Sequence, residues 1–403
     1  MRILLVPALA ALLAIPASAQ QRRAEVSAAD RRAHEHMIVI DTHIDTPTFF
    51  EVPNWDFAAR HVYAEDNSQI DLPRMDAGGL DGGFFVIYTA QGPLTPAGYA
   101  QARDAALLRA VAIQRTIAAN ADRIGLVTTA DEAERLARAG RHFAFISIEN
   151  SWPLGEDLSL LTTFYRLGVR MAGPVHNGSN QLADSASGPV TWNGLSPLGR
   201  QWVAEMNRLG MIIDVSHSSD ASFDQMLALS RAPIIASHSG AKAIFDHRRN
   251  LDDERMRRLA AAGGLMMVNS VFLNAGTDLS DERDALQERQ KQWGNLDAAQ
   301  RRQLQADLAA LNAQRPYTTA DFELYMRAIL HAVRVMGADH VGLGADWDGG
   351  GGVIGMQDIT ALPRISARLR REGLSEAQIA GIMGGNLLRV LRQVQAAAAH
   401  QAP

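Results

Sequence analysis

The sequence contains no cysteine and only two lysines, Lys242 and Lys291, so almost all of its positive charge is arginine. Without cysteine there is no disulfide framework, no thiolate metal ligand and no cysteine that could carry a lipid at a cleavage site. No basic stripe is present either, and the formal net charge is -5 at pH 7. This charge pattern argues against a nucleic-acid-binding protein.

Long hydrophobic runs are also scarce. The apolar run Ile3–Ile15 is too short to span a bilayer comfortably. It follows Arg2 and precedes the small-residue pattern Ala17-Ser18-Ala19, which is typical of a signal-peptide cleavage site. We therefore expect residues 1–19 to be a signal peptide and the mature protein to be exported, soluble, periplasmic or secreted, without a membrane span. A retained anchor helix is the alternative. The ending AAAAHQAP is not apolar enough to predict a lipid anchor.

Apolar runs do occur, but they are short and recur along the chain. They have the length and near-continuous hydrophobicity of parallel strands that are buried on both faces. We predict eight such strands within the following segments: 37–45, 82–90, 143–150, 169–177, 210–217, 232–239, 263–271 and 340–348. Amphipathic stretches that begin near Tyr99, Asp131, Pro197 and Asp321 separate several of them and predict helices.

Eight strands that alternate with helices predict an α/β protein with a (β/α)8 TIM-type barrel, in one domain over residues 20–403. An open doubly wound sheet is the alternative, but no G-x-G-x-x-G motif follows the first strand. The segment 277–314 is rich in Gln, Arg, Asp and Ala and predicts a helical insertion after the seventh strand. It is either a solvated helical hairpin or a lid over the barrel mouth, where the βα loops of such barrels build active sites.

Polar residues recur at the predicted carboxyl ends of these strands. His43 and Asp45 are two residues apart, so they share one face of the first strand. Similar positions on other strands hold Glu149, His176, His217, His238 and Asp346, with Asp348 two residues further on. Any one histidine is readily explained as a hydrogen-bonded core side chain. Together they predict one convergent site, because barrel closure brings the carboxyl ends of the strands to one mouth.

Imidazole and carboxylate groups without a thiolate suit zinc, and also manganese, iron or cobalt. Three histidines and two carboxylates are too many for one open catalytic zinc, but they suffice for two ions that share a bridging group. The bridge must be a carboxylate or a modified lysine, and neither Lys242 nor Lys291 ends a predicted strand. Glu149 is therefore the natural candidate for the bridge.

These stretches resemble the membrane dipeptidase (renal dipeptidase) family of the amidohydrolase superfamily. The similarity covers most of the mature chain, in the family's order, and is carried by DTHID, SIEN, HNGSNQLADS, GLSPLGRQWVAEMNRLGMIIDVSH, SRAPIIASHS, HRRN, HVGLGADWDG and GNLLRVL. The resemblance implies a zinc-dependent dipeptidase that cleaves the amide bond of small dipeptides and tolerates a D-residue at the C-terminal position. Family members often form dimers, so the resemblance also suggests a homodimer.

The resemblance further implies a role for each site residue. His43 and Asp45 would bind the first Zn2+, His217 and His238 the second, and Glu149 and a hydroxide would bridge the two. His176 would contact the substrate carbonyl, Arg249 would hold the substrate carboxylate, and Asp346 would be the catalytic acid/base. From the residues alone, Arg249 could equally form a surface ion pair, and Asp348 is expected to support its neighbours rather than to react.

The chain departs from the family pattern at three places: NSVFLN from Asn269, NSWPLGED after Glu149, and the long insertion near Thr277. All three concern the substrate pocket and leave the predicted metal ligands intact. Two other functions therefore stay open. One is an amidohydrolase of the same fold that acts on an N-acyl amino acid, lactam or lactone. The other is a metal-binding protein that binds a peptide without catalysis.

Overall fold

The short apolar runs form a parallel sheet that curls into a barrel. In the computed structural model, which describes residues 26–399, the strands β6-β5-β4-β2-β1-β9-β8-β7 are hydrogen-bonded in this order. An isolated parallel β-bridge connects Asp214, the residue after β6, to Ile235, the first residue of β7. In addition, Val215 N–H donates to the Ile235 carbonyl over 2.8 Å. The ring of eight strands is thus nearly closed, as the sequence predicts for a (β/α)8 barrel.

All eight predicted strands are present, and all are shorter than their apolar runs except β4, which has the length of its run and begins one residue earlier. Their bounds are β1 Ile40–Ile44, β2 Gly82–Tyr88, β4 His142–Glu149, β5 Val169–Ala172, β6 Ile212–Ile213, β7 Ile235–Ser239, β8 Leu265–Val268 and β9 Val341–Leu343. A ninth strand, β3 (Ile124–Leu126), pairs with β4 outside the ring. We did not predict β3, because a three-residue segment with only one fully buried side chain gives no apolar run.

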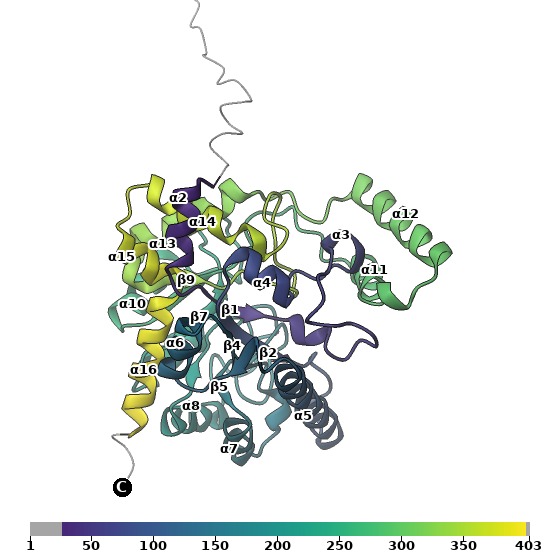
Figure 1. Ribbon diagram of the computed structural model, residues 1–403. Helices are drawn as coiled ribbons and strands as arrows, with labels where there is room; N and C mark the ends of the chain where they lie inside the picture. Colours follow the sequence, from purple (N-terminus) through teal and green to yellow (C-terminus); the bar gives the residue numbers. More distant parts are fainter. Residues whose placement is uncertain (1–25, 400–403) are drawn as a thin grey trace, which may run out of the picture.

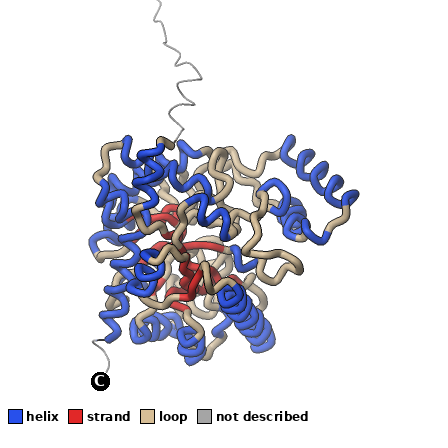
Figure 2. Tube along the Cα trace, in the orientation of Figure 1, coloured by secondary structure: helices blue, strands red, loops and turns tan. Residues whose placement is uncertain are grey.

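Helices surround the barrel (Figures 1 and 2). The α-helices are α2 Ala28–Glu35, α3 Tyr63–Asp66, α4 Leu72–Gly78, α5 Pro96–Ala119, α6 Ala130–Arg138, α7 Ser159–Arg166, α8 Pro197–Leu209, α9 Asp220–Leu229, α10 Asp253–Ala261, α11 Asp281–Lys291, α12 Ala298–Gln314, α13 Phe322–Met336, α14 Leu362–Arg371, α15 Glu376–Ala380 and α16 Asn386–Ala399. The short 3-10 helices are η1 Thr46–Thr48, η2 Trp152–Leu154, η3 Trp293–Asn295, η4 Ala338–His340 and η5 Ile359–Ala361. A short π-helix, η6, covers Gly381–Gly385.

Local sequence signals explain where several helices begin. Thr129 caps α6, and its side chain and that of Glu132 satisfy each other's backbone N–H groups in a capping box. Pro197 occupies the first turn of α8, and the side chain of Ser196 accepts from Gly199 N–H. These caps place the helix starts close to the positions that the sequence predicts.

The helix α16 closes the barrel at the end where the strands begin. Its Leu387, Leu391 and Val394 belong to the same buried cluster as Ile40 and Phe143, which lie at strand starts. With that end filled by apolar side chains, the opposite end, where the strands finish, is left for polar residues.

The segment 277–314 contains two helices, α11 and α12, and no strand. In Figure 1, α12 extends away from the barrel, whereas α11 lies between α12 and α3. The predicted signal peptide, residues 1–19, lies outside the described residues. Within residues 26–399, no helix has the length and apolar character needed to cross a membrane.

Candidate metal centre and active site

The barrel brings the predicted site residues to one mouth. His43 and His238 lie within β1 and β7, Glu149 is the last residue of β4, and Asp45 directly follows β1. The others follow their strands by a few residues: His176 and His217 by four, and Asp346 by three. All of these side chains are buried except that of His176, which is 19% exposed. The predicted convergence of side chains from different strands is therefore present in the fold.

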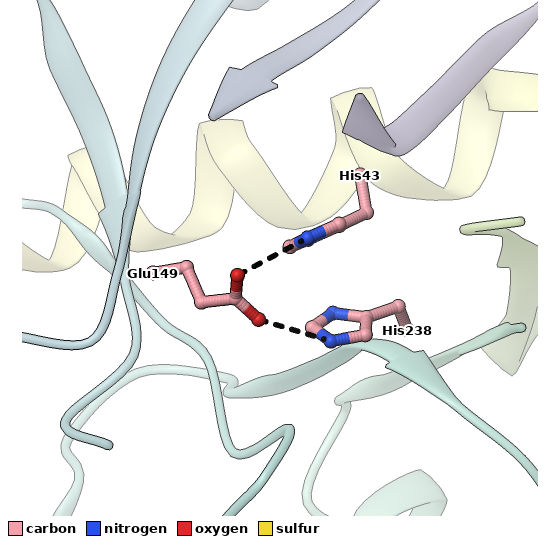
Figure 3. A group of neighbouring side chains, drawn as sticks. All are labelled: His43, Glu149 and His238. Atoms are coloured by element: carbon pink, nitrogen blue, oxygen red, sulfur yellow. Dashed lines mark ion pairs between the residues drawn. The ribbon is translucent and has the colours of Figure 1, made fainter. Parts of the chain in front are cut away.

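Glu149 lies at the centre of the group. Its Oε1 is 2.9 Å from Nε2 of His217, 3.3 Å from Nε2 of His238 and 4.0 Å from Nε2 of His176. Its Oε2 is 3.7 Å from Nε2 of His43. Figure 3 shows the carboxylate between His43 and His238, with one oxygen directed to each ring. The two oxygens of one carboxylate therefore face different imidazoles.

A second group of carboxylates surrounds His43. Its Nε2 is 3.2 Å from Oδ2 of Asp45 and 3.9 Å from Oδ1 of Asp346. Gly349 allows these carboxylates to approach, because a Cβ there would lie 2.1 Å from Oδ2 of Asp45 and 2.4 Å from Oδ1 of Asp346. A side chain at position 349 would therefore displace both carboxylates. Sequence reasoning missed this glycine, and the only signal for it was its place directly after Asp348.

Burial and mutual charge perturb the titration of these groups. Burial lowers the pKa of His217 and of His238 well below the ordinary value, so both rings are neutral. Burial acts to raise the pKa of Glu149, but the electrostatic effect of His176 and His43 and the close contacts with His217 and His238 outweigh it and hold that pKa well below its usual range. Glu149 is therefore an anion among largely neutral imidazoles.

Asp346 is perturbed in the opposite direction. Burial raises its pKa to about 7, with His43 opposing and the nearby Asp45 and Glu149 adding to the shift. Burial also acts to lower the pKa of His43, but Glu149 and Asp45 outweigh it and raise this pKa well above the usual value. A proton on His43 thus balances part of the carboxylate charge, and the site as a whole favours added positive charge.

A hydrogen-bonded chain fixes the orientation of His238. Ser237 Oγ donates to Asp214 Oδ2 over 2.6 Å and lies 2.8 Å from Nδ1 of His238. Because the hydroxyl proton goes to the carboxylate, Nδ1 of His238 must donate, which leaves a lone pair on Nε2. That Nε2 lies 2.9 Å from Nε2 of His217. Support of this kind behind an imidazole is typical of metal ligands.

The chemistry of these side chains fits divalent metal ions. Three overlapping groups each place three ligand atoms within 4.8 Å of one another: His43, Glu149 and His238; Glu149, His176 and His217; and His43, Asp45 and Asp346. Oδ1 of Asp45 is buried without a hydrogen-bond partner among the described residues. A cation would satisfy this oxygen and the facing Nε2 atoms of His217 and His238 at the same time.

Three residues at the mouth have left-handed backbone conformations that non-glycine residues rarely adopt. They are His217 (φ 66°), Asp346 (φ 69°) and Asp348 (φ 63°). Such conformations cost about 1–3 kcal/mol each and concentrate at functional sites. Asp348 accepts from Thr46 Oγ1 over 2.5 Å and from Gln69 N–H over 2.6 Å. It therefore supports its neighbours, although it also borders the cavity described below.

Arg249 is not a surface residue. It is 4% exposed, and burial lowers its pKa to about 10, with Glu149 and Asp346 opposing the shift. Its Nη2 donates to the carbonyl of His238 over 3.4 Å, its Nε lacks a hydrogen-bond partner among the described residues, and its guanidinium lies 5.3 Å from the ring centre of Phe272. The alternative of a surface ion pair is therefore wrong.

A cavity of about 420 Å³ opens above this group. Its inner wall contains five of the predicted site residues: Asp45, Glu149, His176, His217 and Asp346. The sequence analysis missed several other bordering residues: Thr48, Tyr63, Tyr88, Tyr317 and five residues from Leu279 to Lys291. Tyr88 could have been found as the end of its strand, since it pairs in register with Glu149. The others lie in loops and the insertion, where sequence gives no such signal.

Comparison with known proteins agrees with this geometry. The family model for membrane dipeptidases (peptidase family M19) matches residues 28–402. The dipeptidase tcpJ of Claviceps purpurea is 33% identical over 291 residues, which cover 72% of this chain and 60% of that protein. A probable dipeptidase of Pseudomonas aeruginosa, PvdM, has a crystal structure that is 31% identical with a TM-score of 0.78, covering 92% of this chain and 98% of that one.

A third similar protein is a metallopeptidase from Rhodobacter sphaeroides, whose structure holds a phosphinate mimic of the dipeptide L-Ala-D-Ala. It is 26% identical with a TM-score of 0.70, and the match covers 89% of this chain and 99% of that one. The model match over nearly the whole described chain, the barrel and the imidazole–carboxylate site lead to the same assignment. The chain belongs to the membrane dipeptidase family of metallopeptidases and is a metal-dependent hydrolase.

Proposed function

We propose that this protein is an exported dipeptidase with two zinc ions, which hydrolyses the single amide bond of small dipeptides that have a free C-terminal carboxylate. The observation that carries the proposal is the position of Glu149, whose two oxygens face imidazoles from different strands. One carboxylate in this position suits a bridge between two ions.

In this proposal His43 and Asp45 hold the first ion, His217 and His238 hold the second, and Glu149 bridges them. The 3.2 Å contact between His43 and Asp45 and the 2.9 Å contact between His217 and His238 support this division. The rings of His238 and His43 also lie close together, with 3.7 Å between their centres and a tilt of 37°, so the two ion sites would adjoin.

Two divalent ions would supply Lewis acidity and make water nucleophilic near neutral pH. Asp346, buried at the inner wall of the cavity, would take a proton and return it to the leaving amine at its carboxylate. His176 borders the cavity as a neutral ring, since burial lowers its pKa, and would donate a hydrogen bond to the carbonyl oxygen of the scissile amide. Arg249 would hold the substrate carboxylate through its planar fork.

Tolerance for a D-residue at the C-terminal position is part of the proposal. It is supported by the Rhodobacter sphaeroides relative, which binds a mimic of L-Ala-D-Ala. We also propose removal of residues 1–19 on export to the periplasm or the medium, a single barrel domain over residues 20–403 that includes the insertion 277–314, and a homodimer.

The test is amine release from a panel of L,L and L,D dipeptides by the zinc-loaded mature protein, with a chelated sample as the control. We expect cleavage of some members that the chelator abolishes, and about two zinc ions per chain. A protein that binds two zinc ions and cleaves no dipeptide would refute the substrate class. N-acyl amino acids, lactams and lactones are then the panel to assay, and an Arg249→Ala variant with unchanged turnover would show that no carboxylate is recognised.

A further inference from the structure

One wall of the cavity comes from the insertion rather than from the barrel. The residues of α11 that border the cavity are Asp284, Gln287, Glu288 and Lys291, and Leu279 precedes them in the loop. Their spacing of three, four and seven residues places them on one face of a helix. The insertion therefore presents a continuous helical face to the space above the candidate metal centre.

This wall is held firmly. Arg283, 3% exposed, forms an ion pair with Asp278 over 3.2 Å and donates to Asn312 Oδ1 and to the carbonyl of Arg315, each over 2.6 Å. Beyond the helix end, Asn295 Nδ2 donates to the carbonyl of Pro53 over 3.0 Å. The Arg283 contacts thus join the two ends of the insertion, and the Asn295 contact attaches it to the loop at Pro53.

The charges on this face are unequal. Lys291 lies 2.7 Å from Glu288, so these two charges largely cancel. The carboxylate of Asp284 has no hydrogen-bond or ion-pair partner within residues 26–399. Burial raises its pKa, and Asp281 and Glu288 add to that shift, whereas Lys291 opposes it without forming an ion pair with Asp284. Asp284 is thus an unpaired negative charge that borders the cavity.

Three tyrosines line the cavity that Asp284 borders. Tyr63, Tyr88 and Tyr317 border the same cavity, and Asp284 acts electrostatically on both Tyr88 and Tyr317. The hydroxyls of Tyr63 and Tyr88 have no hydrogen-bond partner in the described part of the chain. The Tyr317 ring has Arg283 5.9 Å from its centre. A carboxylate and tyrosine rings that border one cavity can together bind an ammonium or guanidinium group.

We infer that Asp284, together with Tyr63 and Tyr88, forms a subsite for a positively charged side chain, so that the enzyme favours dipeptides with Lys, Arg or ornithine at the N-terminal position. This inference rests on the proposed function. Arg249 adjoins the cavity through Phe272, a lining residue whose ring centre lies 5.3 Å from the Arg249 guanidinium. In this inference Arg249 holds the C-terminal carboxylate at that side, and the N-terminal side chain occupies the side that α11 lines. The side chain is then the part of the substrate that meets Asp284.

The test compares kcat/KM for Arg-Ala and citrulline-Ala, because citrulline has nearly the shape of arginine without the charge. The variants are Asp284→Asn and, as a matched control, Asp281→Asn, since Asp281 lies on the same helix, is exposed and does not border the cavity. Ala-Ala serves as the substrate without a long side chain.

For the wild type we expect kcat/KM for Arg-Ala to exceed that for citrulline-Ala by about 3- to 10-fold, the range for a partly exposed charge with aromatic support. Asp284→Asn should reduce this ratio to about 1 while leaving Ala-Ala cleavage unchanged, and Asp281→Asn should retain the ratio. The preference should also shrink as salt is added.

A wild-type ratio of 1 with normal Ala-Ala cleavage would overturn the cationic subsite and leave the proposed function intact. So would equal losses for all three substrates in Asp284→Asn, since that result means that Asp284 recognises the common α-ammonium group. Failure to cleave any dipeptide would overturn both the subsite and the proposed function.

Discussion

Replacement of Glu149 by glutamine is the sharpest test of a shared carboxylate between two ions. Oε1 of Glu149 faces Nε2 of His217 at 2.9 Å, and Oε2 faces Nε2 of His43 at 3.7 Å. Glutamine retains one acceptor oxygen at nearly the same place, but it presents an NH2 group on the other side and carries no charge. The variant therefore removes the bridge with little change in volume.

The expected size of the effect follows from the charge and its burial. Two unit charges about 4 Å apart interact by about 4 kcal/mol at an effective dielectric constant of about 20. Each 1.4 kcal/mol changes a binding constant about tenfold. We therefore expect the affinity for at least one ion to fall by about 1,000-fold in Glu149→Gln.

The assay is metal content after dialysis of the stripped protein against buffered free zinc. We expect about two ions per chain for the wild type and at most one for Glu149→Gln, with loss of hydrolysis. Glu323→Gln is the matched control, because Glu323 is 65% exposed and forms an ion pair with Arg368 on the surface. A Glu149→Gln protein that retains the wild-type metal content and activity would refute the bridging role.

Three further variants test other parts of the structure. Ser237→Ala removes the hydroxyl between Asp214 and His238, so zinc affinity should fall about 10- to 100-fold in a competition titration; unchanged affinity would contradict the orienting role. Asp346→Asn should lower kcat about 100-fold or more with nearly unchanged KM and metal content, and a pure KM effect would exclude the proton-transfer role. Burial raises the pKa of Asp81 from 3.8 to about 6, so the folded protein binds this proton more tightly than the unfolded chain, and the stabilisation is full below about pH 4 and lost as pH rises through 6. The measured quantity is the unfolding free energy of metal-free Asp81→Asn minus that of metal-free wild type. This difference should increase by about 3 kcal/mol from pH 4 to pH 7, and a difference that does not change with pH would refute this.

The sequence by itself determined the barrel and the site at its mouth. Near-continuous apolar runs bury both faces of a parallel strand, so their number and order predict β1, β2 and β4 to β9. Polar residues directly after such runs must meet at one end of a closed barrel, which is why His43, Glu149 and His238 could be grouped without coordinates. The weak strand β3 escaped because it buries too little to leave a pattern.

Tertiary structure alone decided how the group is arranged and what surrounds it. The burial of Arg249 and the close approach of Gly349 to two carboxylates depend on loops whose paths are set by long-range contacts. The sequence of the insertion likewise left two alternatives open, a solvated helical hairpin or a lid over the barrel mouth, because its polar composition does not show what it contacts. Its attachment beside the cavity includes the hydrogen bond from Asn295 to the carbonyl of Pro53, a partner far away in the sequence. The periodicity of apolar residues predicts which face of a helix or strand is buried. It does not predict which segment a polar face contacts, because that contact is fixed only when the chain folds.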